Sequence, residues 1–495
     1  MRSEMWDVLV IGGGPAGVTA ALRARELGAK RVALVEQKPR LGGTCTNDGC
    51  VPTRVWAKAA RLRRDAEQFA EYGLTGPPPE LDFRRLQAQT REIVGRIHDK
   101  KRIPDHLRDA DITVFEGAGA ARFVDPHAVT LESGEMLRAE TFILCAGGHA
   151  RLPDFEGSEL TRTPTQLWSL DELPASAVVV GAAATGCQIA SILNTFGVDV
   201  TLLEMAPRVL PQEDADVSAA MAESLAARGV RVLTDIGPIS RVERSADGEP
   251  LVVCFPHEGR EDATASGGLV VVATGWAGNA DALNLGAAGV DTDRGFVTVD
   301  DALRTSAPHI FAAGDITGRM MLVQSAYDEA RVAAENAVRG ADRRDTHRIV
   351  PHGGFTDPEY GSVGLTEEQA GEKEPGGCLT AVVPYADLDR AVIDGRTEGL
   401  CKLIVARGSG RVVGAHVIGE QALEVVQVVA AGMAARVTVD RLAELELAYP
   451  TFTGVVGLAA RQLCREMGLI ARSGECAALV EEPRATEWEH RADPE

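Results

Sequence analysis

The feature that most constrains the fold of this chain is a glycine-rich turn between a short apolar strand and a helix near the N-terminus. The strand covers residues 7–11, and the turn after it contains Gly12, Gly14 and Gly17. An Ala-rich helical stretch and a second apolar strand come next, and that strand ends in Glu36, roughly 20 residues beyond the turn. This order of strand, turn, helix, strand and acid predicts an α/β dinucleotide-binding unit.

Each residue of this pattern has a physical role in such a unit. Gly12 permits the tight turn, Gly14 lets the backbone approach a pyrophosphate, and Gly17 lets helix and strand pack closely. The helix N-terminus then faces the phosphates, and Glu36 can accept hydrogen bonds from the ribose hydroxyls. We therefore predict all four as nucleotide-binding residues.

A related pattern recurs later in the chain. The apolar run 177–180 is followed by Gly181, Ala183 and Gly186, and a further strand ends in Glu204. A second nucleotide site is therefore expected, but the methyl group of Ala183 lies where the pyrophosphate usually approaches. Glu204 would repel a 2′-phosphate, which favours NADH over NADPH. A retained domain that no longer binds nicotinamide tightly stays open as an alternative.

Two cysteines, Cys45 and Cys50, follow the first unit with four residues between them. Such a pair can close a small disulfide ring, and a helix start and a cation such as Arg54 stabilise a thiolate. A zinc site would need two more ligands at suitable spacing, and no Cys or His cluster supplies them, so no metal ligand is predicted. Next to a dinucleotide unit, the pair is predicted to be a redox disulfide.

Size and charge exclude other classes of protein. A length of 495 residues is too long for one hydrophobic core and predicts three or four domains. The net charge of −21 argues against a nucleic-acid partner. No apolar run approaches the roughly 20 residues that span a bilayer, so no membrane insertion is expected. Nine irregularly spaced cysteines without an export signal predict a cytoplasmic protein with mostly free thiols.

The segment 42–54 resembles the redox signature of the class I pyridine nucleotide–disulfide oxidoreductases, the family of lipoamide dehydrogenase, glutathione reductase and mercuric reductase. The similarity extends to about residue 470. Residues 305–315 resemble the second FAD motif of the family, and 321–324 resemble the flavin-side segment after it. The short turns 146–148 and 273–275 resemble the crossings between the two nucleotide domains.

The resemblance implies roles for these residues and a partner. Cys50 would lie against the flavin as the charge-transfer thiol, and Cys45 would exchange with substrate. The protein would be a homodimer whose site is completed by the partner's C-terminal domain. Besides the four residues of the first unit, the implied FAD residues are Gly43, Thr44, Arg54, Gly117, Ala118, Ala146, Gly147, Gly314, Asp315, Met321 and Gln324. The implied NAD residues are Gly181, Ala183, Gly186, Gln188, Glu204 and Gly275.

The chain departs from the family where the acid–base pair should be. Disulfide reductases of the family carry a His-Pro and a nearby Glu, but Tyr449 and Gly454 stand at these positions. A tyrosine with its ordinary pKa near 10 is a poor base at neutral pH, although it can donate a hydrogen bond. We therefore expect slow turnover of lipoamide or glutathione, with Tyr449 as the residual catalytic residue. His352 and His416 are expected to be structural.

Three further departures surround the expected flavin. Arg54 replaces the lysine of the family, and Gln188 replaces the glutamate that pairs with it. The loss of a carboxylate should make the flavin edge more electropositive and raise its potential. Ala184 replaces an aromatic residue and should open the nicotinamide pocket to oxygen or quinones. Compensating drift within a working reductase is the alternative.

The predicted fold class is α/β, with Rossmann-like FAD and NAD domains and an α+β C-terminal domain for dimerisation. The expected divisions are an FAD domain at 1–155 and 281–345, an NAD(P)-type domain at 156–280, an interface domain at 346–470 and a charged tail at 471–495.

The leading functional hypothesis is an FAD-dependent oxidoreductase that passes electrons from NADH through flavin and the Cys45–Cys50 pair. Its substrate would be a small-molecule or carrier-bound thiol or disulfide. A diaphorase or oxidase that reduces quinone or oxygen, and a mercuric reductase-like metal-ion reductase, stay open as alternatives. A non-catalytic flavoprotein subunit is the third possibility.

Overall fold

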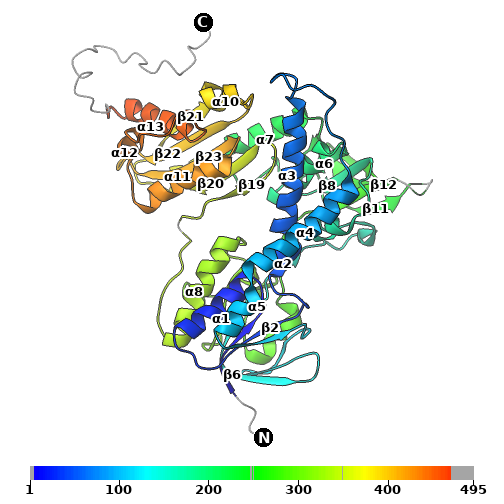
Figure 1. Cartoon of the computed structure of the whole chain (residues 1–495), viewed down its shortest axis with the longest axis vertical. Helices are drawn as coiled ribbons and strands as arrows, with labels where there is room; N and C mark the ends of the chain where they lie inside the picture. The colour runs from blue at the N-terminus through cyan, green and yellow to red at the C-terminus, as the bar shows by residue number, and fades with distance from the viewer. Residues whose placement is uncertain (1–4, 246–247, 249, 348, 470–495) are drawn as a thin grey trace.

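The computed structural model describes residues 5–245, 248, 250–347 and 349–469. The predicted charged tail at 471–495, with its Cys476, lies outside these residues. Three units, each built on a main sheet with flanking helices, form an elongated molecule (Figure 1). No helix in the described part of the chain is both long and apolar enough to cross a membrane.

The N-terminal unit is built on a mostly parallel sheet with strand order β3-β2-β1-β6-β5-β4, and β18 pairs with β6. The first two strands are continuous apolar runs because parallel strands are buried on both faces. Late segments complete this unit, since β18 joins the sheet and α8 packs beside α1 (Figure 1). The strands are β1 (Met5–Ile11), β2 (Val32–Glu36), β3 (Ile112–Glu116), β4 (Arg122–Asp125), β5 (Ala128–Thr130), β6 (Met136–Leu144) and β18 (Ile310–Ala312), and the two helices are α1 (Pro15–Glu26) and α8 (Val323–Arg339).

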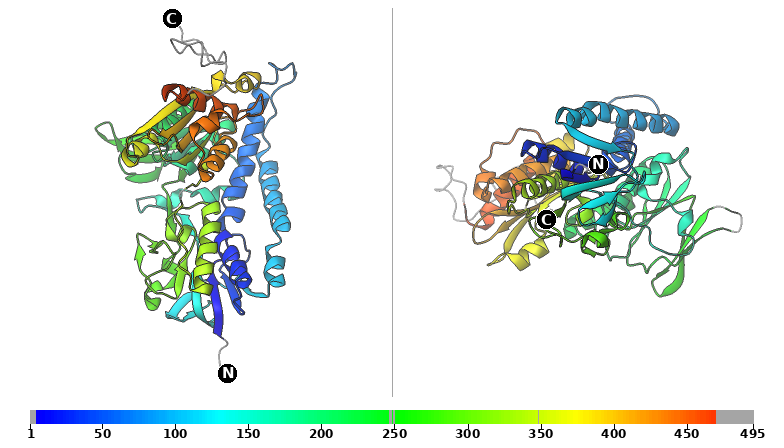
Figure 2. Two further views of the ribbon diagram at one scale, coloured as in Figure 1. Left: turned by 90° about the vertical axis from the view of Figure 1, so that its left-hand side faces the viewer. Right: turned by 90° about the horizontal axis from the view of Figure 1, so that it is seen from below.

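A helical excursion interrupts the N-terminal unit between β2 and β3. Its long helix α3 runs from the N-terminal unit to the C-terminal unit, and α4 returns beside it (Figure 2). The Asp82 carboxylate caps α4 by accepting the Arg85 N–H at 2.9 Å. The helices are α2 (Gly43–Asn47), α3 (Cys50–Glu67), α4 (Phe83–Lys101) and α5 (Ile103–Asp109).

The second unit repeats the first on a smaller scale, with a parallel sheet of order β10-β9-β8-β14. A three-stranded antiparallel sheet, β11-β12-β13, packs beside it. The chain crosses between the two units at β7 (Gly148–Ala150) and β15 (Trp276–Gly278), which pair with each other. The remaining elements are β8 (Ser176–Val180), α6 (Ala184–Thr195), β9 (Asp199–Leu203), α7 (Ala215–Ala227), β10 (Arg231–Leu233), β11 (Arg241–Arg244), β12 (Leu251–His257), β13 (Arg260–Gly267) and β14 (Leu269–Val272).

The C-terminal unit is a five-stranded antiparallel sheet of order β19-β20-β23-β22-β21. Helices α11 and α13 pack on it and bury a large apolar cluster. Its elements are β19 (His352–Gly354), β20 (Glu359–Gly364), α9 (Glu367–Lys373), β21 (Cys378–Pro384), α10 (Asp389–Ile393), β22 (Leu400–Ala406), β23 (Val412–Gly419), α11 (Ala422–Ala434), α12 (Val439–Ala443) and α13 (Gly454–Glu466).

Buried ion pairs fix the C-terminal unit against the rest of the molecule. Arg64 of α3 pairs with Asp357, and both side chains are largely buried. Lys402 of β22 is buried and lies 2.9 Å from each of Asp214 and Asp216 at the start of α7. Because an unpaired charge is costly inside a protein, these contacts hold the three units in one arrangement.

Candidate redox-active site

A cavity of about 470 Å³ lies at the carboxyl ends of the parallel strands of the N-terminal unit. Its wall brings together segments that are up to about three hundred residues apart in the chain. Ten residues predicted from the sequence line it: Gly12, Gly14, Glu36, Gly43, Thr44, Cys45, Ala146, Gly147, Gly314 and Asp315.

The glycines of the first turn serve different purposes. Gly12 has a positive φ of 110°, and a Cβ there would lie 2.2 Å from the Cys145 carbonyl oxygen. A Cβ on Gly17 would lie 1.7 Å from the Gly12 carbonyl oxygen. Gly14 is different, because its Cβ would meet only the Gly43 Cα, at 3.6 Å. The protein itself thus requires glycine at two of these positions, and at Gly14 the space opens into the cavity.

The same turn leaves backbone donors free for an anion. Helix α1 begins after Gly14 without a side-chain cap, so its first N–H groups face the cavity unsatisfied by side chains. Such a helix start is a phosphate-binding site. The cavity therefore fits the pyrophosphate of a dinucleotide.

Two acidic residues hold equivalent places in the two nucleotide units. The Glu36 carboxylate accepts the N–H groups of Gly13 and Lys38, both at 2.7 Å. The Glu204 carboxylate accepts the N–H groups of Ala182 and Ala206, at 2.6 and 2.8 Å. Each acid therefore fixes its own glycine turn in addition to any contact with a ribose.

The second glycine turn has the backbone of the first. Gly181 has a positive φ of 98°, and a Cβ on Gly186 would lie 1.7 Å from the Gly181 carbonyl oxygen. Ala183, the N-cap of α6, has φ −75° and ψ −174°, against −76° and −173° for Gly14. Alanine therefore adds only a methyl group here. Gly275, at a positive φ of 108°, closes the crossing and accepts the Arg151 N–H at 2.9 Å.

Cys45 and Cys50 are brought together by two consecutive helices. Cys45 lies in α2 and is half-buried, whereas Cys50 begins α3 and is exposed. The hydrogen bond from Cys50 lowers the pKa of Cys45 to about 7, although burial opposes this. The same hydrogen bond raises the pKa of Cys50 well above its usual range. The pair therefore shares one proton and presents one thiolate near neutral pH.

Four residues implied for FAD lie beside the cavity lining. Gly117 and Ala118 donate their N–H groups to the carbonyls of Lys38 and Glu36, both at 3.0 Å. Met321 is 41% exposed, and Gln324 donates to the Pro351 carbonyl at 2.8 Å. The residues that line the cavity in their vicinity are Gly119, Ala120, Ala121, Val323 and Ala326. Three of these, Gly119, Ala120 and Ala121, form a run of small residues directly after Ala118, and this run could have identified them in the sequence.

Position 188 is a glutamine, so the carboxylate partner of Arg54 comes from another part of the chain. The Arg54 guanidinium lies 3.5 Å from the ring centroid of Phe355 and 3.6 Å from Glu359. Gln188 instead accepts the Phe355 N–H at 3.1 Å. Glu359 is therefore a carboxylate partner that the sequence comparison at Gln188 could not reveal, and Arg54 is not an uncompensated cation. Burial raises the pKa of Glu359, and Arg54 opposes that rise.

Tyr449 is 70% exposed on the surface of the C-terminal unit. Its hydroxyl donates a hydrogen bond to the Asp389 carboxylate at the start of α10. The two histidines expected to be structural lie elsewhere, in the contact between the second and third units. His352 lies 3.2 Å from Glu213, and His416 lies 3.1 Å from the Ser362 hydroxyl.

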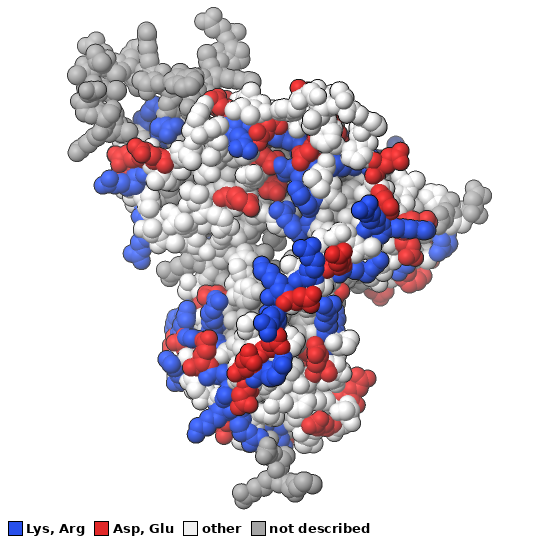
Figure 3. Space-filling model, viewed as in Figure 1, with Lys and Arg blue, Asp and Glu red and all other residues white. Residues whose placement is uncertain are grey.

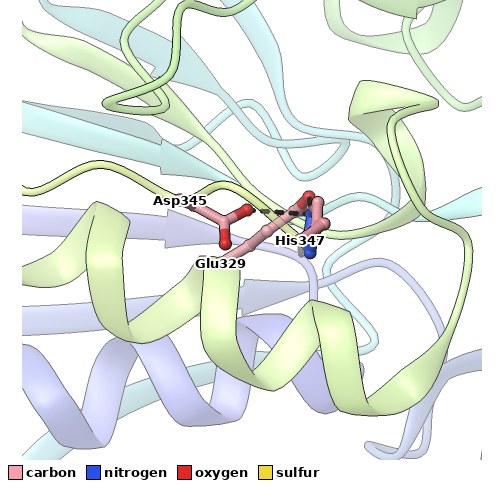
Figure 4. Close-up of side chains that lie close together, drawn as sticks. All are labelled: Glu329, Asp345 and His347. Carbon is pink, nitrogen blue, oxygen red and sulfur yellow. Dashed lines mark hydrogen bonds and ion pairs between the residues drawn. The ribbon is translucent and has the colours of Figure 1, made fainter. Parts of the chain in front are cut away.

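A largely buried cluster of Glu329, Asp345 and His347 (Figure 4) contacts the turn that contains Gly314, one of the residues predicted to bind FAD. Glu329 of α8 accepts the Gly314 N–H at 2.6 Å. His347 Nε2 lies 2.7 Å from the other Glu329 oxygen and 2.8 Å from Asp345. These two carboxylates raise the pKa of His347 to about 9. Burial, with Glu329 close by, raises the pKa of Asp315 to about 6.

This cluster predicts a pH dependence above neutrality. Because the pKa of His347 is raised from 6.5 to about 9 in the folded protein, its stabilising contribution is complete below pH 6.5 and is lost as the pH rises to 9. The melting temperature and the retention of FAD should fall over this window. A His347→Asn variant should start lower and lose this pH dependence. An identical decline in both proteins would contradict the assignment.

The comparisons with known proteins agree with this geometry. Residues 6–330 match the pyridine nucleotide-disulphide oxidoreductase family, and residues 350–460 match the dimerisation domain of that family. The chain is 31% identical over 474 residues to the dihydrolipoyl dehydrogenase of Zymomonas mobilis, covering 91% of this chain and 96% of that protein. It is 31% identical over 463 residues to the mercuric reductase of Lysinibacillus sphaericus, covering 93% and 83%.

A solved structure shares the fold across nearly the whole chain. The HOCl-induced flavoprotein disulfide reductase RclA from Escherichia coli superposes with a TM-score of 0.81 at 27% identity, covering 92% of this chain and 99% of that one. Its Cu(II) complex matches with the same TM-score and identity, covering 93% and 100%. The predicted fold class and family resemblance are confirmed.

Proposed function

Because this chain belongs to the pyridine nucleotide-disulphide oxidoreductase family, we propose that it passes electrons from NADH through FAD to the Cys45–Cys50 pair and on to a thiol- or disulfide-type substrate. The observation that carries this proposal is the hydrogen-bonded pair of thiols, with Cys45 in the wall of the dinucleotide-shaped cavity. The chain is an FAD-dependent oxidoreductase, and its dimerisation domain supports a homodimer.

The residues around the cavity fit FAD. The open N-terminus of α1 and the space beside Gly14 suit the pyrophosphate, and Glu36 suits a ribose. Asp315, buried beside the cavity, suits a hydroxyl of the ribityl chain. When bound, FAD supplies a carrier that exchanges electron pairs with both nicotinamide and a disulfide.

The dithiol pair performs the exchange itself. The Cys45 thiolate attacks a substrate disulfide, forms a mixed disulfide and releases one substrate thiolate. Cys50 then gives up its proton and attacks Cys45 Sγ, which releases the second substrate thiolate and closes the Cys45–Cys50 disulfide. The released thiolates take up protons from water. The substrate disulfide is reduced and the cysteine pair is oxidised by the same two electrons.

Labelling of the two cysteines tests this function. The air-oxidised, FAD-loaded protein should take up iodoacetamide at Cys45 and Cys50 only after anaerobic incubation with NADH. Mass spectrometry of the peptides reads both positions at once, and Cys145, which is buried, serves as an internal control. If NADH does not change the labelling at either position, the proposed path is wrong.

The second nucleotide unit supports NADH as the donor. Its glycine turn has the backbone of the first turn, and the Glu204 carboxylate, held by two N–H groups, is a negative charge that would repel a 2′-phosphate. Arg208, the nearest following cation, is directed to the carbonyls of Pro211 and Glu213, both at 3.0 Å. NADPH is therefore disfavoured.

Replacing Ala183 by glycine should strengthen NADH binding. The backbone angles already match those of Gly14, so the change removes only the methyl group that faces the pyrophosphate. We expect the apparent Kd for NADH, from the concentration dependence of anaerobic flavin reduction, to fall by about fivefold. NADPH is the control, because Glu204 still opposes its phosphate. An unchanged Kd for NADH would mean that this methyl group does not obstruct the site.

A thiol-bound metal ion is a second candidate acceptor. A mercuric reductase is among the similar proteins, and RclA has a Cu(II) complex. In this chain the half-buried Cys45 lines the cavity and the exposed Cys50 is hydrogen-bonded to it, so soft metal ions could reach both thiols. NADH oxidation measured with Hg(II) or Cu(II) in excess thiol, against glutathione disulfide and lipoamide, separates the two acceptor classes. Turnover with metal alone would favour this candidate.

A further inference from the structure

The C-terminal end of α4 packs on α2, the short helix that carries Cys45. Lys101 Nζ donates a hydrogen bond to Thr46 Oγ1 at 3.0 Å. One turn earlier, His98 Nε2 lies 2.8 Å from Asn47 Oδ1. Thr46 is fully buried, so its hydroxyl is a fixed anchor for the ammonium group. Helix α4 therefore contacts both residues that directly follow the exchange thiol.

The groups that act on the Cys45 thiol come from four different segments of the chain. Cys50 of α3 donates a hydrogen bond to it, and Lys101 of α4 brings a positive charge that lowers its pKa. Asp315, in the turn that follows β18, brings an opposing negative charge. Tyr327 of α8 faces both cysteines, and burial raises the pKa of its hydroxyl, so it stays neutral at physiological pH. Lys101 is thus the cation of this set.

His98 does not supply a second positive charge. Burial, and the neighbouring cations Arg40 and Lys101, lower the pKa of His98 below 6.5. The imidazole is therefore neutral at physiological pH and serves as a hydrogen-bond partner for Asn47. At this end of α4, Lys101 therefore supplies the positive charge and His98 supplies a neutral hydrogen bond.

The C-terminal end of α4 is locally positive, although the protein as a whole is acidic. The chain carries a net charge of −21, yet the last turn of α4 holds two lysines, Lys100 and Lys101, against one acid, Asp99. Lys and Arg side chains gather at the waist of the molecule in Figure 3, where Figure 1 places α2 and α4. A cation fixed beside a thiolate favours the charged form of the thiol.

We propose that Lys101, anchored on Thr46, is the positioning residue that keeps Cys45 as the reactive thiolate in a chain with Tyr449 in place of the family's histidine base. The proposal rests on the proposed function, in which Cys45 exchanges with substrate. Lys101 acts only through its charge and forms no bond to the reacting sulfur atoms. When Cys45 Sγ attacks a disulfide, the sulfur–sulfur bond forms as the substrate bond breaks, and the proton lost earlier from Cys45 has gone to water.

Alkylation of Cys45 tests this proposal in the FAD-loaded protein. In a Cys50→Ser background, where serine keeps a hydroxyl beside Cys45, the rate of iodoacetamide uptake at Cys45 is followed against pH. Lys101→Met should raise the apparent pKa of Cys45 by about one pH unit, which lowers the rate at pH 7 about fivefold. Lys101→Arg should restore most of the rate. The matched control is Lys100→Met, which removes an exposed neighbouring charge and should change little.

A second variant separates charge from anchoring. Thr46→Val removes the hydroxyl that holds the ammonium but leaves the charge, so it should raise the pKa of Cys45 by less than Lys101→Met does. FAD content and circular dichroism report whether each variant is folded, and the Thr46→Val result stands if Lys101→Met does not fold. An unchanged pKa of Cys45 in the folded Lys101 or Thr46 variants overturns the proposal. The assay uses neither NADH nor a disulfide, so a failed proposed function would appear separately, as absent NADH-dependent labelling.

Discussion

A Cys45→Ser variant should lose reduction of disulfide substrates by about a thousandfold or more, while NADH still reduces its flavin. A serine hydroxyl is not ionised near neutral pH and is a poor nucleophile towards sulfur, whereas the pKa of Cys45 is lowered to about 7. The loss should appear in kcat/KM for the disulfide, because the variant cannot form the mixed disulfide. Rapid-reaction absorbance of the flavin measures its reduction by NADH, and steady-state assays measure reduction of the disulfide substrate.

The same variant separates the competing functions. If electrons leave directly from the flavin to quinone or oxygen, quinone reduction should survive in Cys45→Ser at nearly the parent rate. Cys378→Ser is a suitable control, since that thiol is also partly accessible but lies on β21 in the C-terminal unit. Disulfide reduction that persists in Cys45→Ser would contradict the exchange mechanism outright.

A Gly17→Ala variant should fail to retain FAD and should be strongly destabilised. Its Cβ would lie 1.7 Å from the Gly12 carbonyl oxygen, so helix α1 would have to move away from β1. Moving a helix in a packed core costs about 3 kcal/mol or more. The free energy of unfolding from urea titration and the FAD-to-protein absorbance ratio give both effects.

Gly14→Ala is the matched control for that variant. The Gly14 Cβ would meet only the Gly43 Cα, at 3.6 Å, and Ala183 already has the same backbone conformation in the second unit. This variant should fold with nearly parent stability but bind FAD more weakly, because the methyl group points into the cavity. Equal stability losses in the two variants would show that close helix packing at Gly17 is not what requires glycine.

Local patterns were sufficient to predict the architecture of both nucleotide units. The glycine turns and the acids Glu36 and Glu204 lie within about thirty residues of each other, so their geometry follows from one strand–turn–helix–strand unit. The two cysteines of the redox pair are likewise close in sequence. The Glu204 carboxylate, like that of Glu36 in the first unit, is held by two backbone N–H groups.

Contacts between distant segments could not be predicted in this way. Glu359, the partner of Arg54, lies on β20 of another unit, and its position depends on how α3 packs against the C-terminal sheet. Lys101 reaches Thr46 only because α4 folds back on α2. In the sequence, the stretch around Lys101 has the composition of an ordinary solvated helix face. His347 also carried no local signal, since its two carboxylate partners include one from α8.

Anaerobic reductive titration of the FAD-loaded protein tests the central claim most directly. If the thiol pair lies against the flavin and exchanges electrons with it, reduction should proceed in two successive two-electron steps. The first should leave the flavin oxidised beside a thiolate and produce a long-wavelength charge-transfer absorbance, which a double variant with Cys45→Ser and Cys50→Ser should lack. Bleaching of the flavin in a single two-electron step, without that absorbance, would contradict the account.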